Sequence, residues 1–368
     1  MLTIKQFKPF IGDKEYNAIK KCFDGLWITE GPQSEEFLSR MRTMFDTPYV
    51  VFAPNGTLAL YLALKALGVG VGDEVIVPNF TFIATANAVE MTGATPVFVD
   101  IDEDLQMSVS ECSKAITPLT KAIMPAHIFG FTANMEEICK LAESKGLKVI
   151  EDAAQAIGIK RNGKPCGTFG DIGCFSFFAD KTITMGEGGM VVTRDKEVYD
   201  ELLYLRNQGR KDRGTFLHPE IGYNFRITDM QAAVGLAQLD KLPEIIEKKK
   251  EVYSWYLEEL KDLSDVSVYT PDEATDPYIP FRVVIKTDFE SQKLMDFMSS
   301  SGIETRNFFV PLHTQPCYSN GDNCRLEGES FPNSVEAFRH GVCLPSYASL
   351  TKDEVEYVCK VIREYCNV

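Results

Sequence analysis

The sequence predicts an α/β fold built on an open, mostly parallel β-sheet, followed by a smaller α+β domain. Between residue 50 and about residue 193, short β-rich runs alternate with helical patterns, which is the rhythm of βαβ units. Several of these runs are apolar throughout, as expected for parallel strands buried on both faces. The chain has 368 residues. One domain usually holds roughly 100–200 residues, so we expect two.

The expected strands and helices of the sheet domain alternate along the chain. The strands are rich in β-branched and aromatic residues and are Tyr49–Ala53, Glu74–Pro78, Pro96–Asp100, Ala122–Ala126, Lys148–Glu151, Cys174–Phe178 and Met190–Thr193. The helices between them have helical apolar spacing and are Thr57–Leu67, Ile83–Met91 and Met135–Ser144. Parallel strands joined in this way imply right-handed crossovers.

A change of pattern near residue 243 marks the expected domain boundary. The run Thr228–Leu242 predicts a helix with small residues on one side, and Pro243 then interrupts it. A charged helix is expected at Glu244–Leu263. We therefore divide the chain into a large α/β domain with the N-terminal segment, residues 1–243, and a small α+β domain, residues 244–368.

The small domain is expected to contain one strand, Tyr278–Ile285, and two helices, Glu290–Ser300 and Lys352–Tyr365. Thr351 and Glu354 have the spacing of a capping box, which predicts where the last helix begins. Strand and helix together favour an α+β arrangement for this part of the chain.

Charge and hydropathy exclude several kinds of partner. The net charge of −15 gives a surface that repels nucleic acid, so no nucleic-acid function is expected. The sequence contains no run of about 18 apolar residues, so we expect no membrane span. The start of the chain, Met1–Lys8, has no apolar core for a signal peptide, so we expect a cytoplasmic protein.

The cysteines are expected to be reduced thiols rather than disulfides or metal ligands. None of the ten forms a Cys-x-x-Cys pair, and most lie in apolar or helical stretches. His313, Cys317 and Cys324 form the group that comes closest to a zinc site. Their spacing matches no common zinc module and a fourth ligand is not evident, so we expect no metal.

Polar residues follow two of the expected strands. Asn55-Gly56-Thr57 joins a strand to an apolar helix, and such a turn presents free N–H groups that suit a phosphate. An ordinary helix cap by Thr57 is the alternative. Asp152 ends a buried strand, where its carboxylate could keep a pyridine nitrogen protonated, and Gln155 could donate to a ring oxygen. Asp152 could equally cap a helix.

Lys181 lies between an apolar run and a glycine-rich turn. Phe175–Phe178 predicts a buried strand, and Gly186–Gly189 prevents a long exposed helix. A partly buried lysine has a lowered pKa, and its neutral amine can form a Schiff base with an aldehyde. Ser176, five residues earlier, could bind a phosphate of the same ligand. Most lysines are solvated surface groups, and that interpretation stays open for Lys181 taken alone.

Two more residues complete the pattern. Phe82 follows another strand and could cover one face of a pyridine ring, although it could also be a core residue. Asn224 is a polar residue in a run, Gly222–Arg226, that otherwise suggests a packed turn. Three features occur in this order: a Gly-Thr at a strand end, an Asp at a strand end, and a Ser followed by a Lys before a Gly-rich turn. Together they indicate a site for a phosphorylated aldehyde much more specifically than any one of them.

From about Gly25 to Glu364 the chain resembles the DegT-type sugar aminotransferases, which are fold-type-I enzymes that use pyridoxal 5′-phosphate (PLP). The shared patterns are Phe-Ser-Phe-x-x-x-Lys before Gly-Glu-Gly-Gly, Glu-Asp-Ala-Ala-Gln-Ala, and Gly-Tyr-Asn-x-Arg. The resemblance implies that Lys181 binds PLP covalently and that Asp152 pairs with the ring nitrogen. It implies further cofactor contacts from Asn55, Gly56, Thr57, Phe82, Gln155, Ser176 and Asn224.

The resemblance also implies an assembly. In the family, the asparagine that Asn224 matches reaches the phosphate bound by the neighbouring subunit. We therefore expect a homodimer with shared active sites.

A narrower resemblance is to the GDP-perosamine synthase subfamily, in residues 175–193, 303–318 and 344–346. These enzymes move an amino group from L-glutamate to C4 of a nucleotide-linked 4-keto-6-deoxy sugar, in deoxysugar pathways such as those of lipopolysaccharide O-antigen. Asp180 stands where they often have Asn. The residues that we expect to face the sugar are Trp27, Phe309, His313 and Tyr318.

Two other functions are weighed against this one. A PLP-dependent sugar dehydratase shares the fold, but those relatives carry histidine in place of the lysine. A non-catalytic regulatory protein with the same fold would not need the intact set of Lys181, Asp152 and Gln155.

Overall fold

The computed structural model describes residues 3–210, 216–321, 323–326 and 330–367. Its main sheet has the strand order β1-β9-β8-β5-β4-β2-β3-β13. In chain order the strands are β1 (Tyr49–Ala53), β2 (Glu74–Pro78), β3 (Thr95–Val99), β4 (Thr120–Ile123), β5 (Lys148–Asp152), β8 (Ile172–Ser176), β9 (Gly189–Thr193) and β13 (Arg325–Leu326). β9 runs antiparallel to both neighbours and the remaining pairs are parallel. The predicted fold class is therefore confirmed.

Every strand predicted for this sheet is present, with its ends within three residues of the predicted ones. Successive side chains of a strand point to opposite faces, and the packing follows this rule. Val51 and Ala53 of β1 belong to one buried cluster, whereas Val50 and Phe52 belong to another. Apolar runs buried on both faces explain why these strands could be recognised.

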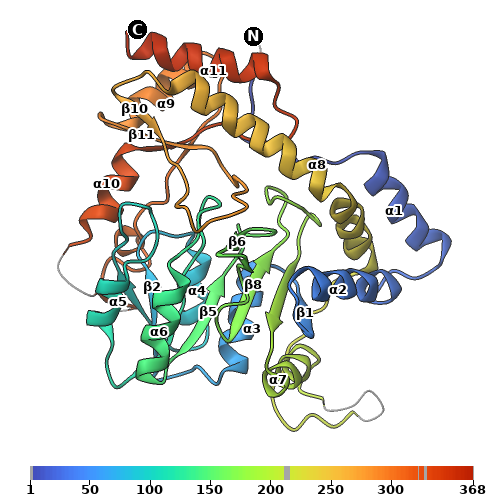
Figure 1. Ribbon diagram of the computed structural model, residues 1–368. Helices are drawn as coiled ribbons and strands as arrows, with labels where there is room; N and C mark the ends of the chain where they lie inside the picture. Colours follow the sequence, from blue (N-terminus) through green and yellow to red (C-terminus); the bar gives the residue numbers. More distant parts are fainter. Residues whose placement is uncertain (1–2, 211–215, 322, 327–329, 368) are drawn as a thin grey trace.

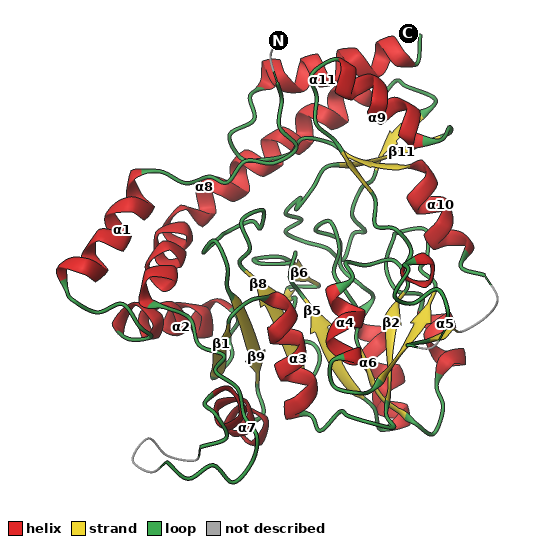
Figure 2. Cartoon of the chain, turned by 180° about the vertical axis from the view of Figure 1, so that it is seen from behind, coloured by secondary structure: helices red, strands yellow, loops and turns green. Residues whose placement is uncertain are grey.

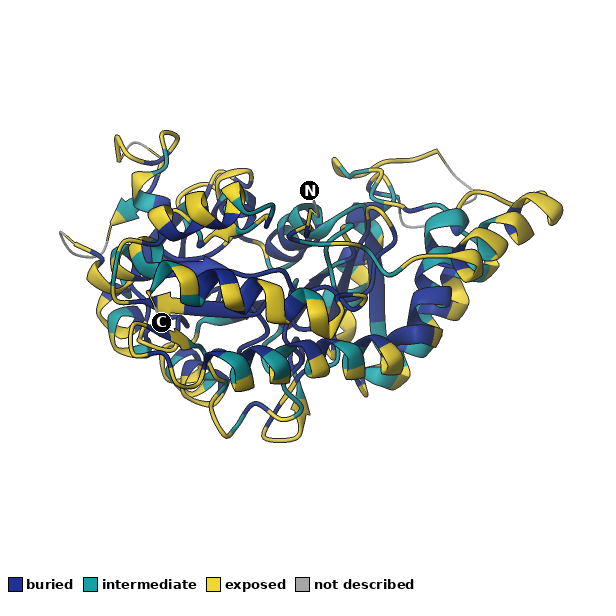
Figure 3. Ribbon diagram, turned by 90° about the horizontal axis from the view of Figure 1, so that it is seen from above, coloured by how far each residue is buried: buried dark blue, intermediate teal, exposed yellow. Residues whose placement is uncertain are grey.

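Helices cover both faces of the main sheet. One face carries α3 (Gly56–Ala66), α4 (Ala84–Glu90) and α7 (Lys196–Arg206). The other carries α5 (Val109–Ala115), α6 (Met135–Lys145) and, beside β1, α2 (Pro32–Met44). Figure 1 looks onto the face covered by α5 and α6, and Figure 2 onto the face covered by α3 and α4. From above, the strands are buried and the outer sides of the helices are exposed (Figure 3).

A second, antiparallel sheet lies near the chain ends. Its order is β10-β11-β14-β12, and its strands are β10 (Val266–Val268), β11 (Val284–Thr287), β12 (Arg306–Asn307) and β14 (Gly341–Cys343). It packs with helices α9 (Ser291–Ser300), α10 (Pro332–His340) and α11 (Lys352–Tyr365). Residues of this sheet, of α9 and of α11 form one buried cluster, and Ile4 belongs to it. The N-terminal segment therefore lies close to α11, the last helix of the described chain (Figure 1).

The predicted break at Pro243 is wrong. A single helix, α8, runs from Asp229 to Leu260 with Pro243 inside it. Leu239, Leu242 and Ile245, on either side of the proline, are all buried, and this packing maintains the helix despite the missing N–H. The helix bends along its length, as an internal proline commonly causes (Figures 1 and 2). The division of the chain at residue 243 therefore stays a prediction.

Two smaller expectations have mixed outcomes. The strand predicted at Tyr278–Ile285 is wrong over most of its length, because β11 begins only at Val284. The capping box of α11 is confirmed, since Thr351 accepts from the Glu354 N–H and the Glu354 side chain accepts from the Thr351 N–H. The remaining elements of the described residues are α1 (Asp13–Asp24), the hairpin of β6 (Lys160–Arg161) and β7 (Lys164–Pro165), and the short 3-10 helix η1 (Leu312–Thr314). Within the described ranges, no helix has the length and apolar character to cross a bilayer.

Candidate active site

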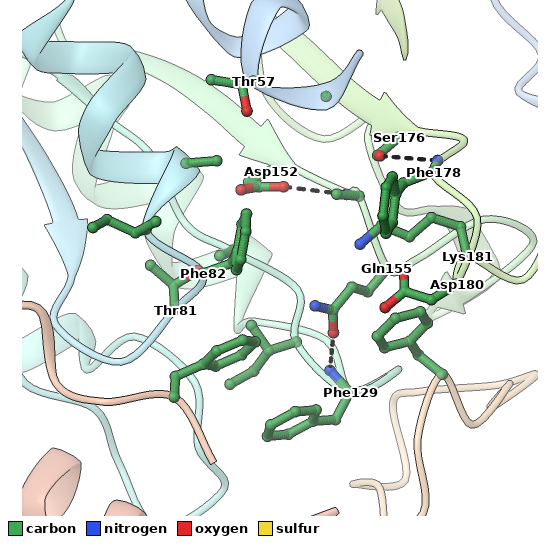
Figure 4. A pocket seen from close by; sticks show the side chains of 18 of the residues that line it. Thr57, Thr81, Phe82, Phe129, Asp152, Gln155, Ser176, Phe178, Asp180 and Lys181 are labelled. Carbon is green, nitrogen blue, oxygen red and sulfur yellow. Dashed lines mark hydrogen bonds between the residues drawn. The ribbon is translucent and has the colours of Figure 1, made fainter. Parts of the chain in front are cut away.

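A cavity of about 870 Å³ opens at the carboxyl ends of the main-sheet strands. This is the edge at which open α/β sheets bind ligands. Asp152 ends β5, Ser176 ends β8, and Phe82 follows β2. Residues near the second sheet, among them Phe281 and Phe309, close the opposite side. The cavity therefore brings together residues that are far apart in the sequence (Figure 4).

The first turn of α3 borders the cavity. Asn55 is the N-cap of α3, because its side chain accepts a hydrogen bond from the N–H of Leu58 at 3.0 Å. The expected alternative of a cap by Thr57 is therefore wrong. The N–H groups of Gly56 and Thr57 have no partner in the described part of the chain, and such groups suit an anion. Ser176 lies directly opposite, since a Cβ added to Gly56 would lie 2.8 Å from the Ser176 Cβ.

Asp152 is held by two hydrogen bonds. Its Oδ2 accepts from the Thr85 hydroxyl at 2.8 Å, and its Oδ1 accepts from the N–H of Ala154 at 3.2 Å. A turn rather than a helix follows Asp152, so the alternative of a helix cap is wrong. Glu151 points to the other side, where it accepts from backbone N–H groups of the 167–170 loop. Thr85 was not predicted, because nothing in the sequence shows that α4 starts beside β5.

Gln155 faces the cavity with its amide nitrogen (Figure 4). Its Oε1 accepts from the N–H of Phe129 at 2.6 Å. The side-chain amide is thereby fixed with its N–H donors directed to the cavity, and donation from them to a ring oxygen stays a prediction. Phe82 also lines the cavity, with 58% of the residue exposed, and therefore offers an open aromatic face.

Lys181 enters the cavity from the side opposite Phe82, with its amine directed toward Asp152 (Figure 4). Among the described residues, no group forms a hydrogen bond or ion pair with Lys181 Nζ, which lies 4.8 Å from the ring centre of Phe281. Burial lowers the pKa of the Lys181 amine, against the opposing effect of the Asp180 and Asp152 carboxylates. A lowered pKa makes the neutral, nucleophilic form of a lysine available.

The sequence did not predict a charged cluster next to Lys181, which consists of Asp180, Arg282 and Arg306. Asp180 Oδ2 accepts from Arg282 Nη2 at 2.6 Å, and Arg306 Nη1 lies 3.5 Å from the same oxygen. All three residues line the cavity. Arg282 and Arg306 belong to no local motif that indicates a shared site, and only the tertiary structure brings them together at Asp180.

Three residues expected at the sugar lie elsewhere, and only Phe309 of that group lines the cavity. Trp27 lines a separate hollow of about 970 Å³. The His313 ring is hydrogen-bonded to Asn79 and the Tyr318 hydroxyl donates to Asn87 at 2.8 Å, both outside the lining residues. Within one subunit, the geometry therefore gives no support to a sugar contact from Trp27, His313 or Tyr318. Asn224 is exposed and does not line the cavity either.

The lining residues match the chemistry of PLP. The amides of Gly56 and Thr57 with the Ser176 hydroxyl suit its phosphate, and the open face of Phe82 suits its flat ring. The Asp152 carboxylate suits the ring nitrogen of PLP, and the Lys181 amine suits its aldehyde. No group of three or more metal-ligating side chains occurs in the described residues.

Comparisons with known proteins agree with this geometry. Residues 9–363 match the DegT/DnrJ/EryC1/StrS aminotransferase family. The GDP-perosamine synthase of Escherichia coli O157:H7 is 42% identical, and the alignment covers 99% of both chains. That of Vibrio cholerae is 37% identical with the same coverage. The crystal structure of the aminotransferase TlmJ from Streptoalloteichus hindustanus superposes with a TM-score of 0.94 at 28% identity, over 100% of this chain and 99% of that one.

Proposed function

Because the chain belongs to the DegT/DnrJ/EryC1/StrS aminotransferase family, we propose that it transfers the amino group of L-glutamate to C4 of a GDP-linked 4-keto-6-deoxy sugar. The enzyme is a PLP-dependent transaminase. The observation that carries the proposal is the Lys181 amine, which lies in the cavity without a hydrogen-bond partner and faces Asp152. The names of the E. coli and V. cholerae relatives support the sugar and the nucleotide.

PLP, when bound, supplies an aldehyde that takes up the amino group and a ring that accepts electrons from the carbon that loses its proton. Lys181 Nζ can bind the aldehyde carbon because its lowered pKa makes the neutral amine available. Once released, the same nitrogen would accept the proton of the substrate carbon as a base and would deliver it, as an acid, to the carbon that carried the aldehyde of the cofactor. Asp152 keeps the ring nitrogen protonated.

Other residues position the cofactor and exclude water. The α3 amides of Gly56 and Thr57 and the Ser176 hydroxyl hold the phosphate, and Gln155 donates to the ring hydroxyl. Phe82 covers the ring, and Phe309 forms part of the wall that the sugar meets.

A homodimer with shared active sites belongs to the same proposal. Leu26, Phe216 and Ile221 are 89%, 88% and 86% exposed, respectively. In the proposed dimer these side chains are covered by the partner subunit. In such a dimer Asn224, which is exposed here, would contribute to the partner's phosphate site, and Trp27 could face the partner's cavity.

The cellular setting is also proposed. Ten free cysteines, seven of them buried, are typical of a reducing compartment, so we place the enzyme in the cytoplasm. The product would be an amino sugar donor for a surface polysaccharide such as lipopolysaccharide O-antigen.

Product mass tests the proposal. The holoenzyme is incubated with L-glutamate and, separately, GDP-, UDP- and dTDP-linked 4-keto-6-deoxy sugars. We expect the GDP-linked sugar to exchange its keto oxygen for an amine. A product that has lost water would indicate a dehydratase, and failure with every donor and keto sugar despite PLP uptake would indicate a non-catalytic protein.

A further inference from the structure

An arginine in the cavity has no hydrogen-bond partner. The side chain of Arg306 is 52% exposed, and its guanidinium makes no hydrogen bond to any residue that the structure describes. The Asp180 oxygen nearest to it, at 3.5 Å, already accepts the short hydrogen bond from Arg282. The donors of Arg306 are therefore available to a ligand.

The surroundings of Arg306 carry excess positive charge. The side chains of Asp180 and Arg282 are only 9% and 6% exposed, and they pair with each other. One carboxylate thus faces two guanidinium groups. Such a site favours a ligand with an anionic group.

The position of the cluster limits which anion it can take. Asp180 directly precedes Lys181, and the ring centre of Phe281 is 4.8 Å from both Lys181 Nζ and the Arg282 guanidinium. An α-amino acid carries its carboxylate on the carbon that bears the reacting nitrogen. A sugar aminated at C4 instead carries its diphosphate at C1, across the ring. A positive charge beside the reacting amine therefore suits the carboxylate of the amino acid rather than the diphosphate of the sugar.

We propose that Arg306 binds a carboxylate of the amino donor, and that Asp180, itself fixed by its hydrogen bond from Arg282, positions the Arg306 guanidinium. A planar guanidinium can bind a carboxylate through two parallel hydrogen bonds, which a lysine cannot reproduce. The inference rests on the proposed function, because it assigns a site to the amino acid of that reaction.

Replacement of Arg306 by glutamine tests the assignment. L-glutamate is titrated into the PLP-loaded enzyme without any sugar, and the loss of the yellow absorbance gives its half-saturation. We expect R306Q to raise this half-saturation about tenfold or more, because a charge-assisted pair is lost. The half-saturation for the keto sugar in the complete reaction should stay within about twofold, since no sugar contact is lost. R306K should lie between wild type and R306Q.

Arg194 offers a matched control, because it is 53% exposed and lies 3.6 Å from Asp46, almost the same values as for Arg306. R194Q should behave as wild type. An unchanged half-saturation for L-glutamate in R306Q overturns the assignment. So does a larger rise for the keto sugar, which would identify a diphosphate site. Because the glutamate titration needs no sugar, it remains decisive even if the enzyme rejects every keto sugar tested.

Discussion

At the scale of single residues, the reactivity of Lys181 comes from its environment. Burial lowers the pKa of its amine, the carboxylates of Asp180 and Asp152 raise it, and the guanidinium groups of Arg282 and Arg306 lower it further. Burial and the charges around the amine together set the pH range in which it is neutral.

Lys181→Ala removes the amine. We expect the variant to lose the yellow absorbance of the covalently bound cofactor and all turnover, because no other lysine of the described residues lines the cavity. Absorbance spectra and product mass provide the measurement, and an unchanged melting temperature shows that the fold is intact. Turnover that survives the substitution would contradict the assignment of Lys181.

Asp180→Asn should shift the pH dependence of cofactor attachment. It removes a charge that raises the Lys181 pKa and leaves two guanidinium charges uncompensated, so the pKa falls further. Lysine reacts only above its pKa, so the midpoint of PLP uptake by the apoenzyme should move to lower pH. Absorbance against pH measures it, with Asp240→Asn as the control. A midpoint at higher pH would exclude this electrostatic explanation.

Thr85→Val should impair catalysis through Asp152. The variant loses the hydroxyl that donates to Asp152 Oδ2, so the carboxylate is less well held against the ring nitrogen. We expect kcat to fall about tenfold while both KM values stay within about twofold, since a hydrogen bond to a charged group contributes roughly 1.5–3 kcal/mol. Thr85→Ser keeps the hydroxyl and should restore kcat. A purely structural role would instead lower the melting temperature of both variants.

At the scale of elements, the close approach of α3 to β8 shapes the phosphate site. A Cβ on Gly56 would meet the Ser176 Cβ at 2.8 Å, so Gly56→Ala should push the two elements apart, with a strain of about 1–3 kcal/mol. We expect weaker PLP binding, measured by absorbance titration. Gly70→Ala is the matched control, because the nearest atom to its Cβ would be 3.9 Å away. Equal PLP affinities in the two variants would argue against a phosphate site here.

The elements that the sequence predicted well are those whose signals are local. β1 and β2 have the predicted ends, because apolar runs between turn residues are visible in the sequence. Asn55–Thr57, Asp152 and Ser176 could be expected at one edge of the sheet, because the ends of parallel strands meet there.

The residues that the sequence missed, and those whose surroundings it could not show, depend on packing between distant segments. Arg282 and Asp180 are 102 residues apart and meet only when the second sheet closes the cavity. Tyr318 lies in a stretch similar to that of relatives, but its ring packs on Phe98 and its hydroxyl turns to Asn87. Pro243 predicted a helix end, and burial on both sides of it determined otherwise.

At the scale of the whole molecule, the exposed apolar residues allow a test of the dimer. We expect the wild type to elute at twice its 41.2 kDa chain mass and Ile221→Glu to shift toward the monomer, because a charge would be buried in the interface. Size-exclusion chromatography with light scattering measures this. Val71→Glu is the control, since Val71 is equally exposed, at 89%, in a turn after α3. A monomeric wild type, or the same shift in both variants, would contradict the proposed interface.

The unbroken course of α8 has a consequence for hybrid enzymes. Its first half packs with the main-sheet core and its second half with the core of the second sheet, so no loop separates the two. Anyone who exchanges the C-terminal part between relatives, in order to alter substrate preference, must join the sequences inside a helix and keep its rotational phase. A junction one residue out of register would turn every later side chain by about 100° and misdirect the whole transplanted half.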